Sequence, residues 1–195
     1  MDVAFTCSLS RSDQSLELAY TIDNREAYEL GLFNRIAWPR PDGTIAFSPD
    51  LAYVELEGGR LLVSQRALPI PEGLRMAAYV PPNVSRIAAH SRVSVRIVLP
   101  IAVTVMQPFQ AAKLRLAQRG EVVADQPATA RSLRLEVGIF PVDAHCKLVA
   151  EHPAHPDVFS VLPPGPAIEH QQLLVFDAPL DPPLPVSSYR VEPWP

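Results

Sequence analysis

The sequence predicts an all-β protein, an antiparallel β-sandwich, on two observations. Large apolar residues recur at every second position in the runs 16–22, 93–99 and 133–139. Successive side chains of a strand point to opposite faces, so each run would turn one apolar face towards a core. The 22 prolines fall mainly between such runs, where proline ends strands and leaves little room for long helices.

The predicted strands follow one another along the chain with turn residues between them. In order they span residues 3–9, 15–23, 28–38, 44–48, 51–57, 60–67, 74–80, 92–99, 113–117, 121–124, 132–140, 146–150, 158–162, 170–177 and 186–191. Short strands at this spacing are typical of a sandwich or barrel and differ from alternating strands and helices. The run 113–117 also contains good helix formers.

Two glycine-containing turns predict hairpins. Gly58-Gly59 supplies the positive φ angles of a two-residue turn, and the resulting register pairs Val54 with Val63 on a buried face. The second turn, at residues 41–43, joins the runs 36–38 and 45–47 in an open register.

Composition limits both the architecture and the partners. A chain of 195 residues can bury about 70% of its unfolded surface, enough for a core without disulfide bonds. We expect one domain, 1–195; the alternative is an Ig-like sandwich at 1–107 followed by a second small β domain at 108–195. The net charge of −4, without a basic block, argues against nucleic-acid and anionic-membrane partners.

The cysteines and the N-terminus indicate a cellular compartment. The first residues lack the charged and apolar regions of a signal peptide, and no apolar run reaches the ~18 residues of a membrane span. Cys7 and Cys146 are therefore expected to be free thiols in a cytoplasmic protein. A periplasmic location stays open if a leader has been removed.

The alternating residues Leu16, Leu18, Tyr20, Ile22 and Asn24 precede an aromatic-rich strand and a Pro-Asp-Gly turn. With this order, the first hundred residues resemble bacterial immunoglobulin-like and fibronectin type III-like accessory domains, and also small intracellular proteinase-inhibitor domains. The resemblance implies an Ig-like first half, extended by strands from the second half. It assigns no functional residue.

One segment carries residues that could bind a metal. His145, Cys146, His152 and His155 are the candidate ligands of zinc or another divalent transition metal, with His170 as a further one. Each of the two His-Pro pairs favours extended backbone, which could turn both imidazoles to the same side. Their spacing matches no standard zinc motif, and the competing interpretation is a solvated loop. Catalysis by Cys146 is disfavoured because adjacent strand residues point to opposite faces.

Standard catalytic motifs are missing from the sequence: it has no phosphate-binding loop, dinucleotide fingerprint or nucleophile elbow. We therefore expect a non-enzymatic binding or structural module without a cofactor, whose partner is a protein. The alternatives are a metal-binding protein that uses the loop 145–157 and a hydrolase with dispersed residues. The proline-free run 131–140 could be an open edge strand for self-association or a partner peptide, or a strand in the sheet centre.

Overall fold

A computed structural model describes residues 1–39, 45–68, 82–105, 120–124, 127–152, 155–187 and 189–193. Its elements, in chain order, are β1 (Val3–Arg11), β2 (Ser15–Asn24), β3 (Leu30–Pro39), β4 (Ile45–Ser48), β5 (Tyr53–Glu57), β6 (Arg60–Gln65), β7 (Asn83–Ile87), β8 (Arg92–Pro100), β9 (Val103–Thr104), β10 (Gly120–Ala124), β11 (Ala128–Pro141), β12 (Lys147–His152), β13 (His155–Leu162), the short helix α2 (Pro164–Glu169), β14 (Gln172–Ser187) and β15 (Tyr189–Pro193). The predicted all-β fold class is confirmed.

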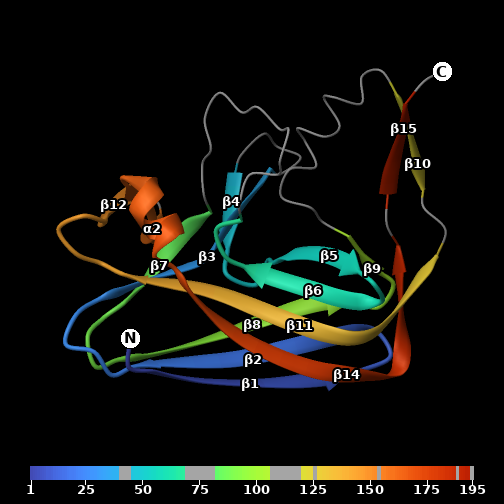
Figure 1. The fold of residues 1–195 in the computed structure, drawn as a ribbon, viewed down its shortest axis with the longest axis horizontal. Coiled ribbons are helices and arrows are strands. Elements are labelled where there is room, and N and C mark those ends of the chain that lie inside the picture. The colour runs from blue at the N-terminus through green and yellow to red at the C-terminus, as the bar shows by residue number, and fades with distance from the viewer. Residues whose placement is uncertain are drawn as a thin grey trace.

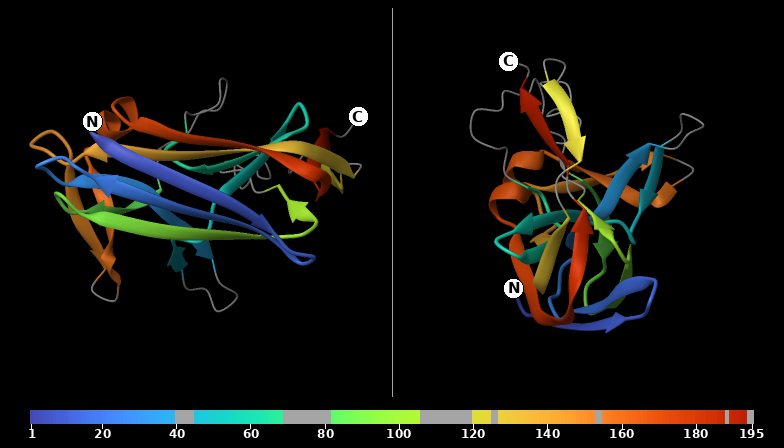
Figure 2. Two further views of the ribbon diagram at one scale, coloured as in Figure 1. Left: turned by 90° about the horizontal axis from the view of Figure 1, so that it is seen from below. Right: turned by 90° about the vertical axis from the view of Figure 1, so that its right-hand side faces the viewer.

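The strands form two packed layers, with a separate two-stranded ribbon of β10 and β15. One layer is the three-stranded sheet β1-β2-β8, and the other is a large sheet that runs β12-β13-β7-β3-β11-β14-β9. Figures 1 and 2 show the three-stranded sheet lying along the face of β11 and β14. A core of buried residues from both layers fills the space between them.

Strand β2 shows why the two layers pack. Its residues Leu16, Leu18, Tyr20 and Ile22 are at most 1% exposed, whereas the residues between them face outward. This is the alternation that the sequence predicted. Burial of the four apolar side chains is the main favourable term for this strand, at about 1.5–3 kcal/mol for each large apolar side chain.

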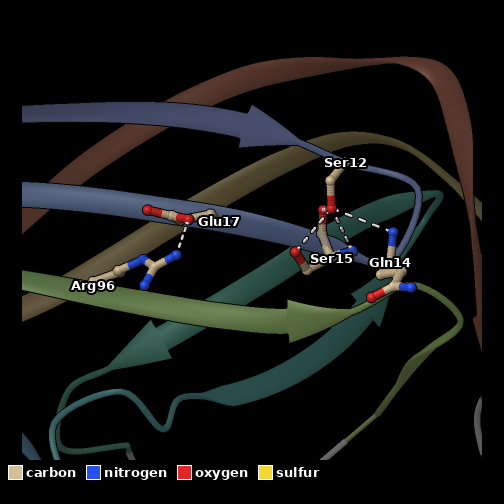
Figure 3. A network of polar contacts seen from close by, with 5 residues as sticks. All are labelled: Ser12, Gln14, Ser15, Glu17 and Arg96. Atoms are coloured by element: carbon tan, nitrogen blue, oxygen red, sulfur yellow. Dashed lines mark hydrogen bonds and ion pairs between the residues drawn. The ribbon is translucent and has the colours of Figure 1, made fainter.

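The outward face of the three-stranded sheet carries small polar side chains and ion pairs. Arg96 of β8 donates to Glu17 of β2 at 2.5 Å (Figure 3). At the β1–β2 turn, the Ser12 hydroxyl accepts hydrogen bonds from the backbone N–H groups of Gln14 and Ser15, at 3.3 and 3.0 Å (Figure 3). A serine side chain therefore supports the tight connection between the two strands.

Strand β11 is the centre of the large sheet. It pairs with β14 along one side, and along the other with β6 and then with β3. Most of the strand pairings are antiparallel, as expected, but the pairing with β6 is parallel, as is the short contact of β9 with β14. The proline-free run 131–140 is an interior strand. The open-edge interpretation of that run is corrected.

The hairpin at Gly58-Gly59 is confirmed. Gly58 and Gly59 have φ angles of 56° and 82°, and Val54 lies opposite Val63, with both valines buried. Strands β3 and β4 also pair as an antiparallel hairpin. The turn predicted at 41–43 lies outside the described residues, as do the strands predicted at 74–80 and 113–117.

Some elements differ from the predicted ones. Strands β7 and β9 and helix α2 were not predicted. The strand expected at 170–177 is part of the longer strand β14, and the strand expected at 186–191 covers the end of β14 and the start of β15. Across the described ranges, no helix is long and apolar enough to cross a membrane. Cys7 is half-buried, Cys146 is buried, and both are free thiols as predicted.

The two halves of the chain share one sheet and one core. Strands β11 and β14, both beyond residue 107, continue the sheet that contains β3 and β6. The main buried cluster likewise extends from Leu16 to Val186.

Candidate functional site

A second, smaller core lies at the end of the large sheet where β11 stops. Its centre is the Phe33–Phe140 pair, whose ring centroids are 4.9 Å apart. Phe140 lies directly across the sheet from Gly31, and a Cβ on Gly31 would be 2.1 Å from the Phe140 ring. Glycine is required at position 31 because the ring lies against its backbone, and this contact fixes the position of Phe140.

The turn after β11 is held by the carboxylate of Asp143. Its Oδ1 accepts hydrogen bonds from the backbone N–H groups of His145 and Cys146, at 2.7 and 3.0 Å. Such an Asx turn satisfies the donors of a tight bend without a strand partner. The bend turns the chain back into β12, and it brings His145 and Cys146 beside Phe140.

Helix α2 forms the opposite wall. Pro164 occupies its first turn, where the missing N–H of proline costs nothing. Ala167 is buried in the second core, and the N–H of His170 donates to the Pro166 carbonyl at 2.9 Å, which ends the helix. The side-chain amide of Gln171 then donates to the backbone of Ala67 at 2.9 Å and ties this end to the sheet.

A cavity of about 320 Å³ lies between the turn and the helix. We call it the α2 cavity; its lining residues are Phe140, Pro141, Asp143, His145, Cys146, Pro166, Ala167 and His170. The apolar part is Phe140 with the two prolines and Ala167. The polar part is the pair of exposed imidazoles and the Asp143 carboxylate. The volume lies at the lower end of the range of small-molecule sites.

The electrostatics of the α2 cavity keep its thiol neutral. Burial, together with the negative charge of Asp143, raises the pKa of Cys146 to about 11. A nucleophilic or metal-binding cysteine needs a lowered pKa, because the thiolate is the reactive form. At neutral pH, Cys146 therefore acts as a small apolar wall of the cavity.

The structure divides the four predicted metal ligands into two pairs. His145 and Cys146 precede β12 and both line the α2 cavity, together with His170. The backbone of His152 pairs with that of His155 at the far end of the β12–β13 hairpin. At a rise of ~3.3 Å per residue, this end lies about 16 Å from the start of β12. The His155 ring packs edge-on against Phe47, with the centroids 5.5 Å apart.

This placement bears on the metal hypothesis. Among the residues that the structure describes, no three His, Cys, Asp or Glu side chains are placed to hold a metal ion. The side chain of His152 lies outside that set, so metal binding by the 145–157 loop stays a prediction. The two adjacent residues His145 and Cys146 both line the cavity because they lie in a turn. The expectation that they point to opposite faces of a strand was wrong.

Sequence reasoning missed most of the cavity. Phe140, Asp143, Pro166 and Ala167 were not singled out as site residues. The segment Pro-Val-Asp after an apolar run is a recognisable Asx-turn signal that could have indicated the bend. No local pattern places α2 beside that bend, because the contact depends on the course of β12 and β13.

Comparisons with protein-family models, with curated proteins and with solved structures find no match to this chain.

Proposed function

We propose that the protein is a non-enzymatic binding module whose ligand is a small organic molecule held in the α2 cavity. The observation that carries this proposal is the convergence of an apolar floor and two imidazoles on one cavity of about 320 Å³. Pockets of this kind, with a few polar groups over apolar walls, are the usual form of small-molecule sites.

The side chains of the α2 cavity favour binding over catalysis. The raised pKa of Cys146 removes it as a nucleophile, and the Asp143 carboxylate is already engaged with two backbone N–H groups. What remains for a ligand is the half-buried Pro141 and Pro166, behind which Phe140 is fully buried, and the ring nitrogens of the exposed His145 and His170. The ligand class that fits is a compact molecule with a flat apolar part and hydrogen-bonding groups at its edge. The free thiols are in keeping with a reducing, cytoplasmic compartment.

A fragment screen by two-dimensional NMR tests the proposal. We expect small heteroaromatic compounds with hydrogen-bonding groups to shift amide resonances in residues 140–146 and 164–170. Affinity should fall at least tenfold, or about 1.4 kcal/mol, in the double variant His145→Ala, His170→Ala. The matched control is Lys147→Ala, because Lys147 is exposed, follows the turn directly and does not line the cavity.

Two results would contradict the proposal. One is a screen in which the compounds shift other regions, or bind the double variant as well as the wild type. The other is equimolar Zn²⁺ binding that is lost in the double variant and that blocks the fragments. That second result would replace the organic ligand by the metal of the alternative hypothesis.

A further inference from the structure

Among the strands that the structure describes, the first half of β14 lies at an edge of the large sheet. In the described part of the chain, β14 pairs with β11 on one side, and on the other only Val186 and Ser187 pair, with β9. No described strand pairs with that other side over residues 172–178, which we call the edge segment. In Figure 1, β14 is the outer strand beside β11. The bond from Arg11 of β1 to the Pro182 carbonyl lies beyond the edge segment.

The edge segment lacks the devices that protect sheet edges. In natural proteins, prolines, charged side chains or a short length prevent an edge strand from pairing with another chain. Four prolines protect the rest of β14, namely Pro179, Pro182, Pro183 and Pro185, but none falls within 172–178. Its outward face carries Leu173 and Val175, which are 37% and 43% exposed. By contrast, β8, at the edge of the three-stranded sheet, carries two arginines and ends at a proline.

The charge of the edge segment is also neutralised. Its one charged residue, Asp177, accepts two hydrogen bonds from Arg134 of β11, at 2.9 and 2.8 Å. Arg134 lowers the pKa of Asp177 through these bonds, so the carboxylate stays ionised and paired. An approaching strand therefore meets an apolar edge with no unpaired charge.

We propose that the edge segment pairs antiparallel with the same segment of a second copy, about a twofold axis at Val175. Val175 is the midpoint of 172–178, so this register uses the whole segment between its start and Pro179. It places Val175 against its own copy and Leu174 opposite Phe176 of the second copy. Asp177 meets Leu173 of the second copy and not its own like charge. Identical strands close an isologous dimer in this way, and the large sheet continues across it.

Sedimentation over a range of concentrations tests the dimer. The wild type is expected to shift from monomer to dimer between about 1 and 500 μM, the range of a weak strand-pairing interface. Val175→Lys should weaken the dimer at least tenfold, because it places two lysines opposite each other. The matched control is Val98→Lys on the edge strand β8, where the valine is 41% exposed; it should leave the dimer unchanged.

Charge reversal and cross-linking test the register. A mixture of Val175→Lys with Val175→Glu should dimerise more tightly than either variant alone, because opposite charges then face each other. Val175→Cys should form a disulfide-linked dimer on mild oxidation, since opposite Cα atoms lie 4.5–5.5 Å apart, within disulfide range. Val98→Cys should not.

A wild type that stays monomeric at every concentration would overturn the proposal. So would a dimer that Val98→Lys disrupts and Val175→Lys does not. A wild-type dimer without the Val175→Cys cross-link would refute the register.

Discussion

At the scale of single residues, burial decides the chemistry of the two cysteines. Burial raises the pKa of both Cys7 and Cys146 to about 11, and only a weak backbone contact to Ser8 opposes this for Cys7. An exposed thiol titrates near 8.5, so folding holds both groups in the protonated form. The thiols therefore contribute stability that is complete below pH ~8.5 and is lost as the pH rises towards 11.

We expect both thiols to react slowly in the folded protein. At pH 8, their reaction with a disulfide reagent should be about two orders of magnitude slower than in urea-denatured protein, and it should speed up towards pH 11. Titration of denatured, non-reduced protein should find two thiols. Equal rates in folded and denatured protein would show that the thiols are not shielded.

At the scale of elements, the β5–β6 hairpin is the clearest case of local specification. Its two-glycine turn has the positive φ angles that its residue types predict, and its register turns Val54 inward at 2% exposure. Glu57, at the end of the same strand, is exposed. Turn chemistry and the apolar pattern demand the same register, which excludes a one-residue slip.

Val54→Asp should therefore destabilise the protein by several kcal/mol, because it buries an unpaired charge. Glu57→Lys, on the same strand, should change the free energy of unfolding by no more than about 0.5 kcal/mol. Urea denaturation of both variants measures the difference. Equal effects would mean that the hairpin register differs from the one described.

At the scale of the whole molecule, one buried hydrogen bond joins the two layers of the sandwich. The Tyr20 hydroxyl, from the three-stranded sheet, donates to Gln65 Oε1 of the large sheet at 2.5 Å. The Gln65 amide donates in turn to the carbonyls of Pro49 and Leu51, both at 2.7 Å. Burial raises the pKa of Tyr20, which keeps the phenol protonated as a donor.

Tyr20→Phe should lower the free energy of unfolding by about 1–3 kcal/mol, because it leaves a buried amide oxygen without its donor. Tyr28→Phe is the control, since Tyr28 is 40% exposed and should tolerate the loss. Thermal melts compare the two. If Tyr20→Phe melts like the wild type, the bond does not contribute to the packing of the layers.

The sequence determined the features that depend on near neighbours along the chain. The period-two pattern located β2, β8 and β11, and Gly58-Gly59 specified a hairpin, because alternation and turn geometry are local properties. Strand β7, with the buried polar residues Asn83 and Ser85, breaks that pattern and was missed.

Only the tertiary structure decided which strands are neighbours. The run 131–140 reads equally well as an edge or a centre, and its partners β6 and β14 come from distant parts of the chain. The same holds for the candidate site. Histidines close in sequence are separated by the β12–β13 hairpin, whereas His170 is brought to His145. Long-range pairing is set by the fit of whole apolar faces, and no local pattern contains that information.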